Sequence, residues 1–273
     1  LLVPDDRVEE IVRHPGVVAA TLTGSERAGR AVATTAGSLL KKTVLELGGS
    51  DPYLVLADAD VELAAATCAA SRMINAGQSC IAAKRFIVHE DVYDEWLGKF
   101  TTRLATTRMG DPLDEETRLG PLARHDLRDR LHQQVLDSSA AGATVALGGQ
   151  VPDGPGAFYP PTVLVDVTPG MPAYDEELFG PVAAVIKVGS EEEAIDVAND
   201  TSFGLGAAVF TTDVARGERI AAERLEAGSC FVNAFVASDP RLPFGGIKAS
   251  GYGRELSDVG MLEFVNQKTV VVD

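Results

Sequence analysis

The chain has 273 residues, 45% of them hydrophobic, and 24 Lys and Arg against 40 Asp and Glu give it a formal net charge of −16. This length and apolar content suit one or two globular domains with ample core. So acidic a chain is not expected to bind nucleic acid or an anionic membrane surface, because both require a basic face.

No stretch of the sequence approaches the roughly 20 apolar residues that a membrane span requires. Residues 1–6 (LLVPDD) lack the basic region and the apolar run of a signal peptide. The cysteines at 68, 80 and 230 form no CxxC pair and have no histidine at metal-ligand spacing, so neither a disulfide framework nor a metal site is expected. A small, odd cysteine count fits a reducing compartment, and we expect a cytoplasmic protein.

Short β-rich runs alternate with amphipathic helical stretches, which predicts an α/β layer structure with mostly parallel strands. In the first part of the chain, strands are predicted over 17–23, 43–47, 53–56 and 86–88. Helices are predicted from the Gly24-Ser25 turn to Ala36, from the cap Asp60 to a stop near Gly77, and over 92–106.

In the second part, a helix is predicted over 127–141, and a Gly- and Pro-rich surface loop over 148–159. Strands over 182–188, 207–210 and 230–232 then alternate with a helix that opens on the capping box Ser190 to Glu193 and with another over 214–224. The apolar run 264–272 predicts a terminal strand. It is either an ordinary core strand or a strand that pairs with a second subunit, and the second is favoured because such an edge must be covered.

Cys80 and Glu46 are the candidate reactive residues. Cys80 falls at a glycine-opened loop or helix start, and Glu46 ends a predicted strand before two glycines. A cysteine is a nucleophile as the thiolate, and a carboxylate can accept a proton from a thiol or from water. Each signal alone is weak, since most lone cysteines are small buried hydrophobes. Cys68, on the apolar face of a predicted helix, and Cys230, at the start of a predicted buried strand, fit that inert role.

Four ordered motifs together resemble the aldehyde dehydrogenase family: LELGG at 45–49, NAGQSC at 75–80, EELFGP at 176–181 and PFGGIKASG at 243–251. The resemblance runs from about residue 17 to the end of the chain. It implies an α/β fold in which a three-layer catalytic domain follows the C-terminal part of a Rossmann-like cofactor domain. The implied boundaries are 1–49 for the cofactor part, 50–246 for the catalytic domain, and 247–273 for a C-terminal return with the oligomerisation strand.

The resemblance also implies a reaction, the oxidation of an aldehyde to the acid with NAD or NADP through a cysteine thiohemiacetal and a thioester. Cys80 matches the nucleophile, and Glu46 matches the base that activates water on the thioester. Relatives that pass the acyl group to coenzyme A or phosphate usually lack this glutamate, so its presence implies hydrolysis.

For the cofactor, the resemblance implies that Glu177 holds the nicotinamide ribose and that Phe179 lies beside the nicotinamide ring. A Gly-Ser turn before a helix suits the pyrophosphate, although the family more often has Thr where Glu26 stands. Glycine also lets the backbone approach the cofactor closely. The implied cofactor residues are Gly24, Ser25, Leu47, Gly48, Glu177 and Phe179.

For the substrate, segments 46–51, 80–88 and 251–257 most resemble bacterial succinate-semialdehyde dehydrogenases. A carboxylated aldehyde needs a cation or several hydroxyl and amide donors in its pocket. Candidate contacts are Asn233, Ser238, Arg241 and Phe244, although Arg241 can equally be a surface charge. Lys248 and Arg254 are interpreted as structural.

Members of the family are nearly twice as long, so the sequence resembles their C-terminal portion. In the family, the preceding part holds an Asn of the oxyanion hole and the residues that distinguish NAD from NADP. A piece of 273 residues is therefore expected to lack appreciable activity by itself. The alternatives are a non-catalytic fragment with a structural or assembly role, and a dehydrogenase for another semialdehyde. The expected partners are the aldehyde and further copies of the chain, in a dimer or tetramer.

Overall fold

The computed structural model describes residues 2–273, and the chain forms two compact units. The first comprises the residues up to Gly48 together with Ala237–Asp273, and the second is Gly49–Val236. Residue 1, where the expected cofactor domain begins, lies outside the described residues. The second boundary falls before the expected position 246, because residues 237–246 bond to the C-terminal segment: Phe244 and Glu255 exchange two backbone hydrogen bonds, of 2.8 and 2.7 Å.

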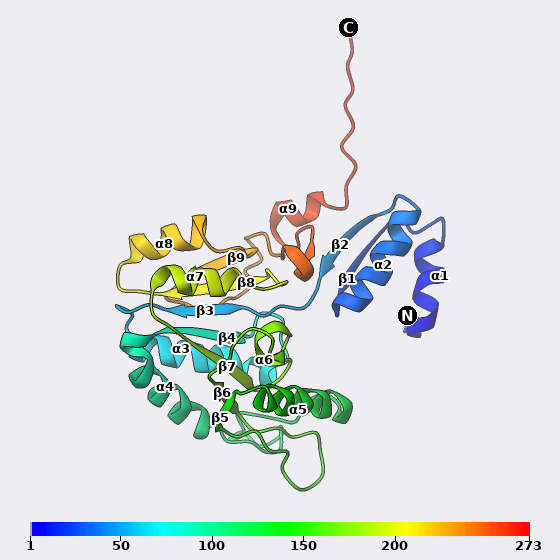
Figure 1. Cartoon of the computed structure of the whole chain (residues 1–273). Helices are drawn as coiled ribbons and strands as arrows, with labels where there is room; N and C mark the ends of the chain where they lie inside the picture. The colour runs from blue at the N-terminus through cyan, green and yellow to red at the C-terminus, as the bar shows by residue number, and fades with distance from the viewer. Residues whose placement is uncertain (1) are drawn as a thin grey trace. The chain divides into compact units, whose positions relative to one another are not determined.

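The first unit contains a three-stranded sheet in the order β1-β2-β10. Strands β1 (Ala19–Thr23) and β2 (Lys42–Glu46) are parallel, and the two-residue β10 (Gly251–Tyr252) pairs antiparallel with β2. Helix α2 (Glu26–Ser38) joins β1 to β2 (Figure 1). Shorter helices complete the unit: η1 (Asp5–Arg7), α1 (Val8–Arg13), η3 (Lys248–Ser250) and α9 (Ser257–Leu262).

The C-terminal run 264–272 forms no strand, and its last valines are exposed, with fractions of 74% for Val270, 78% for Val271 and 89% for Val272. The interpretation as an ordinary core strand is therefore wrong. Among residues 2–273 nothing pairs with this segment in a sheet, so a strand completed by a second subunit stays a prediction.

The second unit is built on a seven-stranded sheet in the order β5-β6-β7-β4-β3-β8-β9. All neighbours pair in parallel except β5 with β6, which confirms the predicted α/β class with mostly parallel strands. The strands β5 and β6 were not predicted. The bounds are β3 (Pro52–Val55), β4 (Arg85–His89), β5 (Thr144–Leu147), β6 (Thr162–Val165), β7 (Val182–Val188), β8 (Gly206–Phe210) and β9 (Ser229–Val232).

Helices cover both faces of this sheet, which gives three layers (Figure 1). Side chains alternate along a strand, so Tyr53 of β3 packs with the core of α3 and α4 on one face, and Leu54 packs with α5, α7 and α8 on the other. The predicted stripe of Trp96 and Phe100 is fully buried, and the two rings stack at 4.5 Å. The helices are α3 (Val61–Met73), η2 (Ile74–Gly77), α4 (Glu90–Ala105), α5 (His125–Ala140), α6 (Pro172–Asp175), α7 (Glu191–Asn199) and α8 (Val214–Glu223).

The predicted helix caps are present. Asp60 Oδ1 accepts from the Leu63 backbone N–H at 3.0 Å, and Ser190 Oγ accepts from the Glu193 N–H at 3.2 Å. Each cap satisfies an N–H group that the first turn leaves without an intrahelical acceptor.

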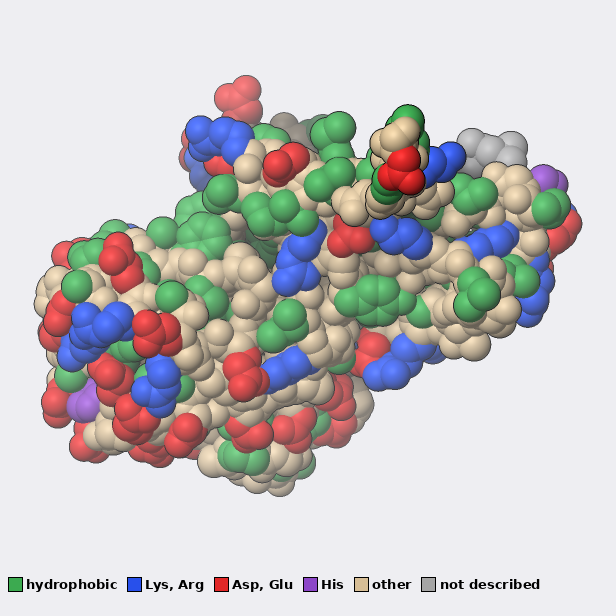
Figure 2. Space-filling model, turned by 90° about the horizontal axis from the view of Figure 1, so that it is seen from above, with side chains coloured by type: hydrophobic (Ala, Val, Ile, Leu, Met, Phe, Trp, Pro, Cys, Tyr) green, Lys and Arg blue, Asp and Glu red, His purple; other side chains and the backbone are tan. Residues whose placement is uncertain are grey.

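Strand β9 lies at the sheet edge, and Cys230 on it is half-buried, so the prediction of a buried strand there is wrong. Within residues 2–273 no helix has the length and apolar character needed to cross a membrane. On the face shown in Figure 2, Lys and Arg side chains are interspersed with Asp and Glu.

Candidate active site

In the first unit, three predicted residues gather at the carboxyl ends of β1 and β2. The Gly24 N–H donates to the Glu46 carbonyl at 2.9 Å, and Ser25 caps α2 by accepting from the Ala28 N–H at 3.3 Å. In open α/β sheets, ligands bind at the carboxyl ends of parallel strands, and the N-terminus of a helix favours a phosphate. This edge therefore has the chemistry that a dinucleotide requires.

Leu47 and Gly48 join the strand end to the C-terminal segment. The Leu47 N–H donates to the Ser250 carbonyl at 3.0 Å, and Ser250 Oγ donates to the Gly48 carbonyl at 2.7 Å. The Leu47 side chain lies against Gly29 of α2, where an added Cβ would come within 2.6 Å of the leucine methyl groups. Gly29 thus lets the helix pack closely on the strand that carries Glu46.

Glu46 is a buried carboxylate at the last residue of β2, only 3% exposed. Neither of its carboxylate oxygens has a hydrogen-bond partner among the residues that the structure describes. Burial, followed by the charge of Glu255, raises its pKa to about 7, and Arg254 opposes this rise. A carboxyl group that titrates near neutral pH can both take and release a proton, and such shifts are concentrated at functional sites.

In the second unit, Cys80 lies in a turn between α3 and β4. After Met73 the chain reverses through left-handed backbone at Asn75 (φ 48°), Ala76 (φ 55°) and Gly77 (φ 73°). A Cβ at Gly77 would lie 2.1 Å from the Gly180 carbonyl oxygen, so a glycine is required there. Cys80 is half-buried after this reversal, in a loop as predicted.

Lys84 connects Cys80 with Glu177. Its Nζ donates to the Cys80 carbonyl at 2.9 Å and lies 3.6 Å from Glu177 Oε1. Glu177 Oε1 also accepts from the Gly49 N–H at 3.0 Å. The structure therefore brings together two residues that the sequence singled out, Cys80 and Glu177, at the amino ends of β3 and β4.

The pKa of Cys80 is raised above the usual thiol value. Burial is the largest cause, and the charges of Asp51 and Glu177 add to it. Lys84 and a hydrogen bond from the Ile81 N–H act in the opposite direction. In this environment the thiol needs a proton acceptor, or added positive charge, to react as thiolate.

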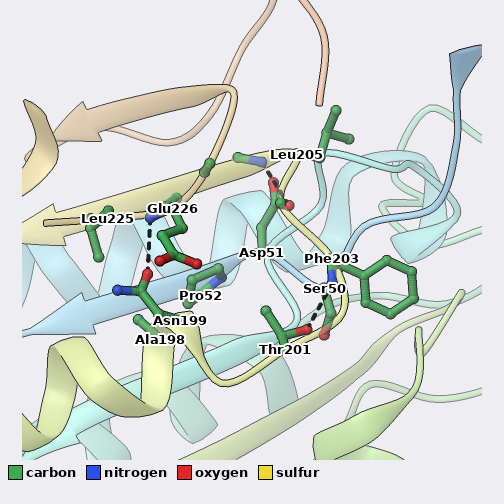
Figure 3. A pocket seen from close by; sticks show the side chains of 14 residues that line it. Ser50, Asp51, Pro52, Ala198, Asn199, Thr201, Phe203, Leu205, Leu225 and Glu226 are labelled. Carbon is green, nitrogen blue, oxygen red and sulfur yellow. Dashed lines mark hydrogen bonds between the residues drawn. The ribbon is translucent and has the colours of Figure 1, made fainter. Parts of the chain in front are cut away.

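Asp51 is a fully buried carboxyl group that precedes β3 in the same site. Its Oδ1 accepts from the Gly206 N–H at 3.0 Å, and burial raises its pKa to about 7 against the opposing charge of Lys84. Figure 3 shows Asp51 and Ser50 at a cavity of about 10 Å³. Asp51 Oδ2 and Ser50 Oγ have no protein partner within residues 2–273, and this volume holds about one water molecule.

The sequence interpretation missed three buried cations, Arg72, Lys84 and Arg85, which are 0%, 1% and 0% exposed. Arg72 donates to the Gly77 carbonyl at 2.7 Å, and Arg85 donates to the Ala198 carbonyl at 2.9 Å. All three bind backbone carbonyls of the loops around Cys80 and at the ends of neighbouring elements. For Lys84 and Arg85 the sequence did carry a signal of burial, because the two adjacent cations stand inside the otherwise apolar run 82–88.

Asn233 does not lie with Cys80. It follows β9 at the carboxyl end of the sheet, whereas Cys80 lies at the amino end. Both halves of its amide are bound to the backbone of Thr211, with Oδ1 accepting at 3.0 Å and Nδ2 donating at 2.9 Å. These bonds favour a structural role for Asn233, and its place near the substrate stays a prediction. Phe179, two residues after Glu177, is 39% exposed.

The remaining candidates lie in the first unit. Arg241 forms a bidentate ion pair with Asp239 at 2.9 and 2.6 Å, and Ser238 is exposed near it in the chain. The backbone of Phe244 is hydrogen-bonded to that of Glu255. Arg254 donates to two backbone carbonyls, at 2.7 and 3.0 Å, which supports its structural interpretation. The described residues contain no group of three or more His, Cys, Asp or Glu arranged to hold a metal ion.

Comparison with known proteins gives consistent matches. The chain is 52% identical over 270 residues to the succinate-semialdehyde dehydrogenase [NADP(+)] of Mycobacterium avium, a match that covers 99% of this chain and 57% of the relative. Among solved structures, succinic semialdehyde dehydrogenase from Streptococcus pyogenes in complex with NADP+ matches with a TM-score of 0.96 and 43% identity, over 100% of this chain and 60% of the other. Lactaldehyde dehydrogenase from Escherichia coli matches with a TM-score of 0.93 and 34% identity, over 96% and 55%.

The chain thus spans less than two thirds of the length of these relatives. The family model described as "Aldehyde dehydrogenase family" matches residues 2–270. With this family model and with relatives similar over nearly its whole length, the chain belongs to the aldehyde dehydrogenase family.

Proposed function

We propose that the protein containing this chain oxidises succinate semialdehyde to succinate with NADP. The observation that carries the proposal is Glu46, a buried carboxyl group without a partner among residues 2–273 and with a pKa near 7, in the motif where the family has its base. The names of the similar mycobacterial and streptococcal proteins support the substrate and the cofactor.

In the proposed acylation, the Cys80 sulfur bonds to the aldehyde carbon and the thiol proton passes to a base. The Cys80 backbone N–H is the donor proposed for the resulting oxyanion. Lys84 donates to the Ser79 and Cys80 carbonyls, so it fixes the peptide units on either side of the nucleophile. When bound, the nicotinamide supplies the hydride acceptor for the oxidation.

In the proposed deacylation, Glu46 takes a proton from water while the water oxygen bonds to the acyl carbon. The carbon–sulfur bond then breaks, the acid leaves, and Cys80 is recovered. A base works best when its pKa lies near the working pH, and Glu46 at about 7 meets that condition.

The residues present fit a dinucleotide. Ser25 is the N-cap of the 13-residue helix α2, whose first turn offers the positive end of the dipole to a phosphate. Glu177 is 22% exposed at its side chain, and a carboxylate can accept hydrogen bonds from ribose hydroxyls while it keeps the Gly49 N–H. Phe179, Leu47 and Gly48 remain proposed cofactor contacts.

For the aldehyde's carboxylate, Ser238, Arg241 and Phe244 remain the proposed contacts in this chain. To bind the substrate in this way, Arg241 must give up its ion pair with Asp239. A cytoplasmic location and a homo-oligomer are also proposed, the latter because the apolar run 264–272 forms no strand within residues 2–273.

The test is Glu46→Gln in the full-length protein, with succinate semialdehyde and NADP in a stopped-flow instrument. Loss of a general base typically costs about 10²–10⁴-fold, so turnover is expected to collapse while a first burst of reduced cofactor survives. Glu115→Gln, at an exposed site, controls for the loss of a carboxylate.

A variant that loses the burst but keeps steady-state turnover would refute the role of Glu46. Full-length protein without turnover on a panel of aldehydes, with NAD and NADP, would favour a structural or assembly role. Higher activity on another semialdehyde would correct the substrate.

A further inference from the structure

Lys84 is a buried lysine just after the turn that carries Cys80. Its side chain is 1% exposed, and taking an ammonium group out of water carries a large free-energy penalty unless donors and charge are satisfied. An ammonium has three N–H donors. Three backbone carbonyls accept from Lys84 Nζ, those of Ser79 at 3.2 Å, Cys80 at 2.9 Å and Ala82 at 3.0 Å.

These carbonyls belong to one turn. The Ala82 N–H donates to the Ser79 carbonyl at 3.1 Å, which closes the turn on itself, and Cys80 lies inside it. The neighbouring Gly49 approaches so closely that an added Cβ would lie 2.9 Å from the Cys80 carbonyl oxygen. The backbone that carries the thiol is therefore fixed from one side by Lys84 and from another by the segment before β3.

Lys84 is the cation that favours a thiolate at this turn. The charged groups that act on Cys80 are Lys84, Asp51 and Glu177, and the two carboxyl groups oppose the lysine. Arg85 faces other carboxyl groups, Asp200 and Asp175 as well as Asp51. Without Lys84, a thiolate at Cys80 would face Asp51 and Glu177 with no cation of this group to oppose them.

We propose that Lys84 is a positioning residue, which holds the turn of residues 79–82 in place and supplies the positive charge that stabilises the Cys80 thiolate. The inference rests on the proposed function in taking Cys80 as the nucleophile. Lys84 also contacts Glu177, so it connects the nucleophile loop to the residue proposed to hold the cofactor.

Two substitutions separate position from charge. Lys84→Met keeps a long side chain and removes the charge together with all three hydrogen bonds. Lys84→Arg keeps the charge, but a planar guanidinium cannot point its donors at three carbonyls gathered around a single nitrogen. The first variant therefore tests both functions of Lys84, and the second tests placement alone.

The experiment measures alkylation by iodoacetamide in the full-length protein across a series of pH values, with the labelled peptides quantified by mass spectrometry. Cys230 is an internal reference, because burial raises its pKa to about 11 and Lys84 is not among the groups that act on it. Lys187→Met, at the one exposed residue of β7, controls for the loss of a lysine. Burst rates of reduced cofactor are recorded for the same proteins.

In Lys84→Met, the pH midpoint for Cys80 alkylation is expected to rise by about one unit, so the rate at neutral pH falls about tenfold. Lys84→Arg is expected to keep the wild-type midpoint and to slow the burst about tenfold. Cys230 should be unchanged in both variants, and Lys187→Met should match the wild type.

The proposal is overturned if Lys84→Met leaves the Cys80 midpoint in place, or if Lys84→Arg shifts the midpoint as far as Lys84→Met does or keeps the wild-type burst. Faster alkylation of Cys230 in either variant would also overturn it, because that result indicates general loosening of the fold. Alkylation requires no turnover. If the Cys80 midpoint shifts in Lys84→Met but the wild type oxidises no aldehyde, the proposed function is refuted and the role of Lys84 stands.

Discussion

Glu46 is expected to lower the stability of the protein at neutral pH. In the folded chain its pKa is raised from 4.5 to about 7. Below pH 4.5 the group is protonated in both the folded and the unfolded states, and its ionisation has no effect. Between these values the unfolded chain releases the proton that the folded chain retains, so stability falls as the pH rises, and the loss is complete above the folded pKa.

The size of the effect follows from the shift. A difference from 4.5 to about 7 is 2.5 pKa units, and each unit corresponds to roughly 1.4 kcal/mol, so the ionised carboxylate costs about 3 kcal/mol above neutral pH. Glu46→Gln replaces it with a neutral group of similar shape. The substitution should therefore stabilise the full-length protein by about 3 kcal/mol near pH 8.5 and by only about 1 kcal/mol near pH 5.

The assay is urea unfolding of the wild type and of Glu46→Gln across that pH range. Glu115→Gln, at an exposed position, controls for the change in net charge and should show no such trend. A stability difference between Glu46→Gln and wild type that does not grow with pH, or that favours the wild type at high pH, would refute the view that Glu46 is an uncompensated buried carboxylate.

Three further substitutions or deletions test other residues. Asn233→Ala removes two hydrogen bonds to Thr211 and should lower the free energy of unfolding by about 1–3 kcal/mol with KM for the aldehyde unchanged; a selective KM increase would return Asn233 to the substrate site. Arg241→Ala should raise KM for succinate semialdehyde about tenfold and leave KM for butanal unaltered. If the variant and the wild type have the same KM for succinate semialdehyde, Arg241 serves only its ion pair with Asp239. Deletion of residues 266–273 should lower the mass in sedimentation while the chain stays folded; an unchanged mass would exclude the segment from the interface.

Local sequence determined most of the elements and singled out Cys80 and Glu46 as the two candidate reactive residues. Caps such as Asp60 and Ser190 act within one turn, and strand β7 is an apolar run interrupted only by Lys187, so both are visible in the sequence itself. Errors occurred where long-range pairing decides. Strands β5 and β6 and the edge position of Cys230 depend on which neighbours a strand finds.

The tertiary structure alone decided the environment of the reactive groups. The sequence shows that Cys80 and Lys84 are four positions apart. Only the fold lets three backbone carbonyls accept hydrogen bonds from the Lys84 ammonium group and brings Glu177 to within 3.6 Å of it. The pKa of Glu46 likewise depends on burial and on Glu255, which is remote in the chain. Residue type sets what chemistry a side chain can perform, whereas desolvation and charge depend on neighbours that the folded chain supplies.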